Sequence, residues 1–165
     1  MPIKHGLLVA ALFAVALNAT AHEKHVHGEA KLEVAIEQNE LALELEMPLD
    51  SAIGFEHAPK TDQQKAALSD ALHHIEDGTA LWRINPEAGC ALKTAKVEAP
   101  EFGGDGHADL DADYAFQCAH PEALKSIETT LFKTFPKLHR IESEWVGPKG
   151  QGAQTLTPTK PALKW

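Results

Sequence analysis

The chain has 165 residues, a formal net charge of −9, two cysteines and ten histidines. A chain of this length folds as one domain around one hydrophobic core. Because its negative charge repels phosphate backbones, the composition argues against a nucleic-acid partner.

The first 21 residues have the features of a secretory signal peptide. Lys4 gives a positive start, an apolar run covers Gly6–Leu17, and small residues lead to Ala21. The run is shorter than the roughly 20 apolar residues that a membrane-spanning helix needs. We therefore predict cleavage after Ala21, a periplasmic location, and a single mature domain of residues 22–165 without a membrane span.

Three histidines follow the predicted cleavage site: His22, His25 and His27. If the strand that contains Leu32 extends back to this segment, His25 and His27 lie on its solvent face about 6.7 Å apart. Their imidazoles could then converge on one ion at the roughly 2.0–2.1 Å of Zn–N bonds. We predict that this segment binds zinc or another divalent transition metal.

A free amino terminus at His22 opens a second possibility. Its amine and its ring could chelate copper together with another histidine, as in copper-binding proteins and in oxygenases with a histidine brace. A mature chain that starts anywhere but at His22 would exclude this brace. A third possibility is a periplasmic interaction module whose histidines have no metal-binding role.

Two stretches, Ala30–Ile36 and Leu41–Met47, alternate apolar and polar residues, which is typical of strands with one buried face. Residues 38–39 between them predict a two-residue turn and therefore an antiparallel hairpin. The register set by this turn pairs Glu33 with Glu44 and Lys31 with Glu46.

Two helices are predicted. Thr61 and Gln64 form a capping-box pattern that predicts a helix running to about Asp77. Pro121 predicts the start of a second helix that ends at Phe135, because apolar residues recur there at helical spacing. The residues of that apolar stripe are Leu124, Ile127, Leu131 and Phe135.

The remaining patterns predict strands, and the sum predicts an α+β fold. We expect an antiparallel sheet with two helices packed on it, a two-layer sandwich. The further strands are expected at Ala80–Ile84, Cys90–Ala99, Asp113–Cys118, Ile141–Val146 and Gln154–Thr157.

Cys90 and Cys118 belong to a chain that is predicted to enter an oxidising compartment, so we expect them to form a disulfide. Closing a loop of this length stabilises a fold by roughly 3–4 kcal/mol on the chain-entropy estimate. Metal ligation by the two thiolates is the alternative, which oxidation opposes.

A second candidate metal site is the aspartate-rich loop GGDGHADLDAD, residues 103–113. The alternating aspartates match the start of a calcium-binding loop. The positions that require Gly and Glu hold Tyr114 and His120, which excludes an EF-hand. A weaker divalent site would use Asp105, His107 and Asp109. His57, which follows Phe55 in another loop, is a further candidate ligand.

Motifs of catalysis are missing from the sequence. Neither GxSxG nor HExxH occurs, and no phosphate-binding loop or cofactor fingerprint is present. We therefore expect a protein that is not an enzyme.

Several segments together resemble one family. HVHGEAKLEVA, GFEHAPKTDQQKAAL, FQCAHPEAL, LFKTFP and GQGAQTLTP occur in this order. They resemble the ZrgA-type periplasmic zinc-binding family, also catalogued as a domain of unknown function. The resemblance implies an α/β sandwich that binds zinc, assists zinc acquisition and works with zinc-import machinery. The ligand candidates that it implies are His25, His27, Glu56 and His57.

The chain departs from the family's pattern in the aspartate-rich loop. Family members usually carry a long His/Asp tract where this chain has only GGDGHADLDAD. This difference favours a single zinc site, or one site and a weak loop, over high-capacity storage of zinc.

Overall fold

The computed structural model describes residues 26–103 and 108–165. The predicted leader and the candidate ligands His22, His25, Asp105 and His107 lie outside the described residues. Within the described residues, no helix combines the length and the apolar character needed to cross a lipid bilayer.

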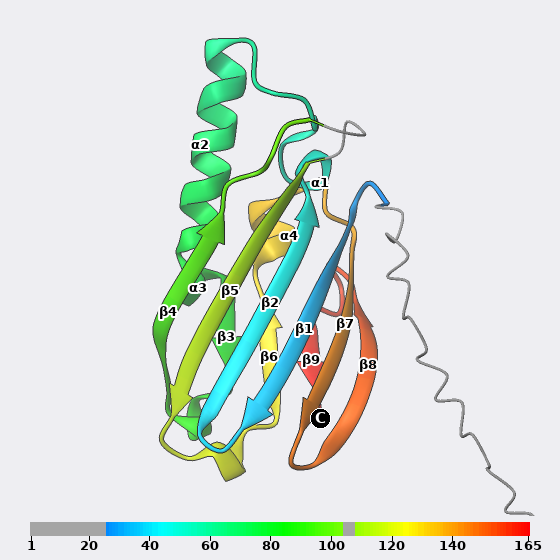
Figure 1. Cartoon of the computed structure of the whole chain (residues 1–165). Helices are drawn as coiled ribbons and strands as arrows, with labels where there is room; N and C mark the ends of the chain where they lie inside the picture. The colour runs from blue at the N-terminus through cyan, green and yellow to red at the C-terminus, as the bar shows by residue number, and fades with distance from the viewer. Residues whose placement is uncertain (1–25, 104–107) are drawn as a thin grey trace, which may run out of the picture.

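A six-stranded sheet forms the larger layer of the structure (Figure 1). Its strand order is β4-β5-β2-β1-β7-β8, and neighbours are antiparallel except for β1 and β7, which pair in parallel. The strands are β1 (Glu29–Glu37), β2 (Glu40–Pro48), β4 (Cys90–Glu98), β5 (Asp109–Cys118), β7 (Arg140–Gly147) and β8 (Gly150–Leu156).

The predicted first hairpin is confirmed, including its register. Glu33 pairs with Glu44, and Lys31 pairs with Glu46. The two-residue turn brings Gln38 to a φ of +53°. The strands expected at Ile141–Val146 and Gln154–Thr157 are present as β7 and β8, which pair antiparallel around a tight turn.

A second layer covers one face of the large sheet (Figure 1). It contains a three-stranded sheet of order β3-β6-β9 and short helices. The strands are β3 (Trp82–Ile84), β6 (Ser126–Thr129) and β9 (Ala162–Lys164). The helices of the chain are α1 (Leu49–Ile53), α2 (Asp62–Glu76), α3 (Gly78–Leu81), α4 (Leu131–Thr134) and the 3₁₀ turns η1 (Pro86–Ala88) and η2 (Pro121–Ala123).

The longest helix, α2, begins as the capping box predicts. The Gln64 amide donates to Thr61 Oγ1 at 3.2 Å, and the Thr61 amide donates to Gln64 Oε1 at 3.3 Å. Ala71 and Ile75 of α2 are buried, and the Tyr114 hydroxyl of β5 donates to the Ile75 carbonyl at 2.6 Å. The apolar side of α2 therefore packs beside β4 and β5.

The hydrophobic core lies between the two layers. Strands β1, β2 and β5 contribute every second residue to it, because successive side chains of a strand point to opposite faces. The largest fully buried side chains are Leu32, Leu41, Leu43, Met47, Leu49, Ile75, Leu81, Leu110, Tyr114, Leu124, Ile127 and Leu131.

The predicted α+β class, an antiparallel sheet carrying two helices, is wrong. The described chain is mostly β, its large sheet is mixed, and the expected second helix over 121–135 is absent. That segment instead forms η2, strand β6 and the short α4. The predicted apolar positions are buried, so their assignment to the core is correct. Only the helical spacing inferred from them is wrong.

The local chemistry of residues 125–130 explains why they form a strand. Ile127, Thr129 and Thr130 are β-branched, which favours strands over helices. The backbone amides of Lys125 and Ser126 donate to Asn85 Oδ1, at 2.9 and 3.2 Å. These amides are therefore satisfied by a distant side chain rather than by a helix.

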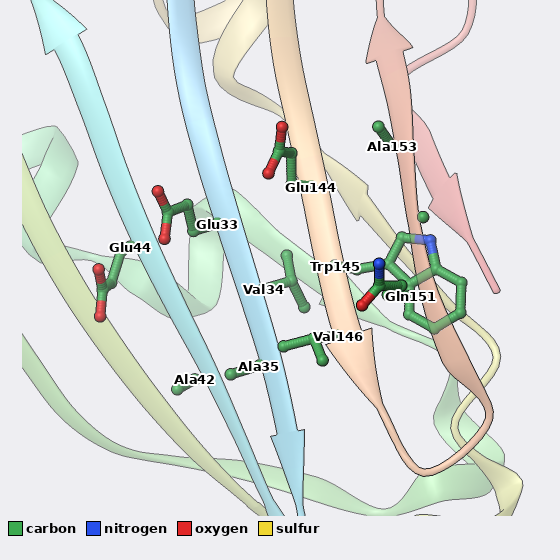
Figure 2. Close-up of a pocket in the computed structure, with 11 residues that line it drawn as sticks. Glu33, Val34, Ala35, Ala42, Glu44, Glu144, Trp145, Val146, Gln151 and Ala153 are labelled. Atoms are coloured by element: carbon green, nitrogen blue, oxygen red, sulfur yellow. The ribbon is translucent and has the colours of Figure 1, made fainter. Parts of the chain in front are cut away.

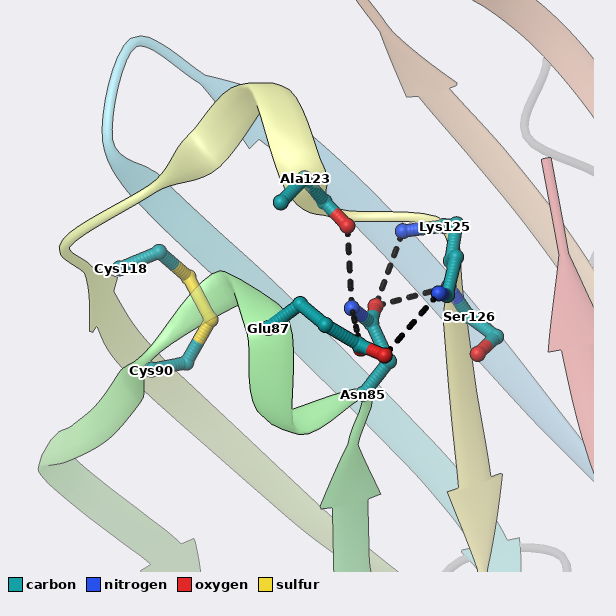
Figure 3. Close-up of a disulfide and its surroundings, with 7 residues drawn as sticks. All are labelled: Asn85, Glu87, Cys90, Cys118, Ala123, Lys125 and Ser126. Carbon is teal, nitrogen blue, oxygen red and sulfur yellow. Dashed lines mark hydrogen bonds and ion pairs between the residues drawn. A yellow bond between two sulfur atoms is a disulfide. The ribbon is translucent and has the colours of Figure 1, made fainter.

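The predicted disulfide is present between Cys90 and Cys118 (Figure 3). The two residues are paired across β4 and β5, at the end of the large sheet opposite α1. Two predicted boundaries shift: Gly78 begins α3, and β3 starts only at Trp82.

Candidate metal site

One end of the large sheet gathers several segments that are distant in the sequence (Figure 1). Strand β1 begins there, β2 ends there and continues into α1, and β5 begins there opposite Pro48. The Leu49 amide of α1 donates to the Ala108 carbonyl at 2.8 Å. We call this region the His27 end; it comprises residues 26–29, 48–57, 108–109 and 139–140.

A tight turn at residues 27–28 holds His27. Gly28 has a φ of +81°, and its amide donates to the buried Ser51 hydroxyl at 2.8 Å. Its carbonyl accepts from the amides of His139 at 2.7 Å and Arg140 at 3.1 Å. The turn is thereby fixed between α1 and the start of β7.

This turn corrects the predicted strand geometry of the histidines. Strand β1 starts at Glu29, and Val26 before it is 52% exposed. His27 therefore lies in a turn and not on a strand face two residues from a partner. His25 lies outside the described residues.

The imidazole of His27 lies between two carboxylates. Its Nδ1 is 3.4 Å from Asp50 Oδ2, and its Nε2 is 3.5 Å from Glu56 Oε1. The His27 side chain is 61% exposed, whereas those of Asp50 and Glu56 are 25% and 11% exposed. The ring is thus open to solvent while its two carboxylates are largely enclosed.

The two separations match a shared metal ion better than a direct hydrogen bond. Charge-assisted N–H···O hydrogen bonds are roughly 2.7–2.9 Å long. Two ligands of a tetrahedral zinc, each with a bond of about 2.0–2.1 Å, lie about 3.3–3.4 Å apart. An ion could therefore lie beside either nitrogen of His27, held by the ring and by one carboxylate.

The short helix α1 and its termination position both carboxylates. Asp50 lies in the first turn of α1, where acidic side chains are favoured. Gly54 ends the helix at a φ of +85°, with its amide bonded to the Asp50 carbonyl at 2.8 Å. A Cβ on Gly54 would lie 2.6 Å from Lys137 Cε, so the chain turns closely past that side chain before it reaches Glu56.

His57 turns toward its own neighbours. Its ring stacks on Phe55 with 5.1 Å between centroids, and Nδ1 lies 3.0 Å from the Ala58 carbonyl. Because a carbonyl only accepts, Nδ1 carries the proton in this contact and Nε2 keeps a lone pair for an ion. Phe55 is half-buried.

The described residues do not complete a metal site by themselves. In residues 26–103 and 108–165, no group of three or more His, Cys, Asp or Glu side chains is arranged to hold an ion. What the described part of the His27 end brings together is the His27 imidazole with one carboxylate on each side. The predicted ligands His22, His25, Asp105 and His107 lie outside this part of the chain.

Asp109 is the one described ligand candidate from the aspartate-rich loop. It begins β5, pairs with Pro48 and is half-buried. Its charge contributes to raising the pKa of the neighbouring Asp111, after the larger effect of partial burial. Asp109 therefore lies at the same end of the sheet as α1, as an acidic neighbour of the candidate site.

Two residues of this end were missed by the sequence analysis. Asp50 stands six residues before Glu56, and an acidic residue two positions after the end of a strand could have indicated it. His139 is exposed and adjoins the turn, since a Cβ on Gly28 would lie 3.0 Å from its Cδ2. Its distance along the chain from His27 left no signal, because only the parallel pairing of β1 with β7 brings them together.

The comparisons with known proteins agree with the resemblance seen in the sequence. The model of a family described as ZrgA family zinc uptake protein matches residues 24–165. The comparison with curated proteins finds no match to the chain.

Proposed function

Because the chain belongs to the ZrgA family of zinc uptake proteins, we propose that it binds Zn²⁺ in the periplasm and holds it for import into the cell. The site of binding is the His27 end. The observation that carries this proposal is the His27 ring with Asp50 and Glu56 at 3.4 and 3.5 Å from its two nitrogens.

The three side chains have different roles in binding, in an arrangement that is common for histidine ligands. One ring nitrogen binds the ion together with the carboxylate beside it. The other nitrogen donates its proton to the second carboxylate, which fixes the tautomer and makes the ring a better ligand. Glu56 is the more enclosed of the two carboxylates, so we assign Nε2 and Glu56 to the ion and Asp50 to the orienting contact.

Zinc in proteins is usually four-coordinate, so His27 and Glu56 require further ligands. His25 directly precedes Val26, and His107 directly precedes Ala108. Both described neighbours belong to the His27 end, which supports His25 and His107 as the remaining ligands. His57, His22, Asp105 and Asp109 are the reserve candidates, and water would fill any open position.

The periplasmic location rests on two observations. Residues 1–21 carry the pattern of a signal peptide. The Cys90–Cys118 disulfide is expected in an oxidising compartment such as the periplasm and is rare in the cytosol. The zinc ion is therefore cargo taken outside the cytoplasm, and the import machinery is the expected recipient.

The proposal is tested by a zinc titration of the mature chain against a chromophoric chelator, with the double variant His27→Ala/Glu56→Gln beside it. We expect one tight site whose affinity falls in the variant by more than the roughly 100-fold that loss of an outer-shell partner costs, because two direct ligands are removed. The matched control is His120→Ala/Glu122→Gln, another His–Glu pair 3.7 Å apart with a His ring that is 64% exposed. An equal loss in both variants, or none in the first, would contradict the proposal.

A further inference from the structure

One face of the large sheet is left open. The three-stranded sheet and the helices α2, α3 and α4 lie on or beside the opposite face in the described chain (Figure 1). Along β1 the residues that point away from the core are exposed from Glu33 onward, and β5 and β7 follow the same alternation. The outward side chains of six strands therefore form one solvent-facing surface, which we call the open face.

The open face carries carboxylates in register on neighbouring strands. Glu33 of β1 pairs with Glu44 of β2 on one side and with Glu144 of β7 on the other. Glu44 in turn pairs with Asp113 of β5. Since paired strands lie about 4.8 Å apart, four carboxylates follow one another across the sheet.

The adjacent row, two residues along each strand, is nearly as acidic. Its own cation is Lys31, which is 4.0 Å from Glu46. Two of its carboxylates also pair with cations of the flanking rows, Glu142 with Arg140 and Glu98 with Lys96. The pKa of Asp111 in this row is raised, first by partial burial and then by the charges of neighbouring carboxylates. Like charges that face each other across strands destabilise a sheet. The residues of this row are Glu142, Lys31, Glu46, Asp111 and Glu98.

A hollow with an apolar floor adjoins the carboxylates. A cavity of about 470 Å³ is lined by Glu33, Glu44 and Glu144 together with small apolar side chains and Trp145 (Figure 2). Val146 at its edge is 54% exposed, one of few large apolar side chains so exposed among the described residues. A second cavity of about 590 Å³ shares Glu33 and Glu144 and continues toward Val26. The two form one groove along β1 and β7.

We propose that this groove docks an extended polypeptide segment of a partner protein, rich in lysine or arginine with small apolar residues between the charges. The carboxylate rows match the positive charges, and the floor of Ala35, Ala42 and Val146 matches the apolar residues. The same charge repels a second copy of this face, an anionic membrane and nucleic acid. The groove reaches the His27 end at Val26, Glu29 and Pro48, but the three glutamates and Val146 that the test changes lie outside that end.

The test measures binding of the peptide Lys-Val-Lys-Ala-Lys-Val-Lys to the mature protein by fluorescence anisotropy at low salt, with the same peptide carrying Glu for Lys as the negative probe. Exposed ion pairs contribute roughly 0.5 kcal/mol each. The variant Glu33→Gln/Glu44→Gln/Glu144→Gln should therefore weaken binding about tenfold. Val146→Ser should weaken it by a smaller factor.

The matched control is Glu76→Gln/Glu122→Gln/Glu128→Gln, which removes equal charge from α2, η2 and β6. Those three carboxylates are exposed, so the change preserves the fold. We expect it to leave peptide binding within about twofold. If both triple variants lost the same peptide affinity, net charge alone would explain the effect, and the proposal would be overturned.

Two further outcomes are decisive. The open-face triple variant should melt a few degrees higher than the parent, because it removes charge repulsion between strands, and this shows that lost binding is not lost folding. Stoichiometric displacement of the peptide by Ca²⁺ or Mg²⁺, abolished by the same triple variant, would identify the face as an ion site and overturn the proposal.

Discussion

The two ends of the large sheet are built differently. At the end that carries the disulfide, Asn85 is 9% exposed and uses all its hydrogen-bonding capacity (Figure 3). Its Nδ2 donates to Glu87 and to the Ala123 carbonyl, each at 3.0 Å, and its Oδ1 accepts two backbone amides. At the other end, His27 faces two carboxylates at 3.4 and 3.5 Å.

This difference separates a structural end from the His27 end, where we propose that zinc binds. The polar groups around Asn85 are matched to one another at hydrogen-bond distances, so that end needs nothing from outside. The His27 ring nitrogens lie 3.4 and 3.5 Å from the carboxylate oxygens of Asp50 and Glu56, a spacing that suits an ion bound by one nitrogen and the carboxylate beside it. The contrast therefore supports the zinc proposal and also assigns stability to the disulfide end.

The largest expected effect comes from removing the disulfide. Cys90→Ser/Cys118→Ser opens a loop with a sequence separation of 28, which should lower the free energy of unfolding by about 3–4 kcal/mol. Urea denaturation measures the loss, and the zinc titration run in parallel should show an unchanged affinity. If the folded variant lost much of its zinc affinity, the claim that the two ends have separate roles would be contradicted.

Asn85→Ala should have the next largest effect. It leaves the backbone amides of Lys125 and Ser126 without their partner in a half-buried place, at a cost of about 2–3 kcal/mol. Asn85→Asp keeps the acceptor but turns the contacts with Glu87 and the Ala123 carbonyl from attractive to repulsive, so it should be at least as destabilising as alanine. Equal stability of parent and alanine variant in urea would show that this network is not structural.

Gly28→Ala tests the His27 end. The residue has a φ of +81°, and a Cβ there would lie 3.0 Å from His139 Cδ2. We expect a loss of about 1–2 kcal/mol in stability from the left-handed backbone. We also expect weaker zinc binding because His27 loses its fixed position, whereas neither of the substitutions at the disulfide end should change it. The control Gly103→Ala also changes a glycine of positive φ, +159°, but places its Cβ in open space.

The smallest expected effect is a pH dependence at the disulfide end. Hydrogen bonding from Asn85, then a backbone amide and Lys125, lowers the pKa of Glu87 from 4.5 to about 2. The stabilisation from this carboxylate is therefore full above pH 4.5 and is lost as the pH falls toward 2. Melting temperatures between pH 6 and 2.5 should fall less steeply in Glu87→Gln than in the parent. Parallel curves would contradict the assignment.

Sequence reasoning succeeded where the signal was local. The 38–39 turn fixed the hairpin register, and Thr61 with Gln64 fixed the start of α2. The disulfide followed from the expected compartment and the presence of two cysteines. Each of these features depends on residues close in sequence or on a single possible pairing.

It failed where distant contacts decide the structure. The apolar spacing of residues 124–135 fits a helix, but Asn85 takes two of the backbone amides and β3 and β9 pair with Ile127. No local sequence signal indicated the parallel pairing of β1 with β7. Because this pairing brings His139 to the His27 end, the position of His139 was missed too. For the candidate site, the sequence indicated His27 and Glu56 as ligand candidates. It did not indicate that a turn would place His27 between Asp50 and Glu56.

The central claim is that zinc binds at His27. Long-range ¹H–¹⁵N NMR spectra of the histidine rings, recorded on the mature chain before and after one equivalent of Zn²⁺, test it most directly. The account predicts a large shift of one His27 ring nitrogen, with His73, His74 and His120 unchanged. Zinc binding that leaves the His27 nitrogens unchanged, or that moves the four rings alike, would contradict it.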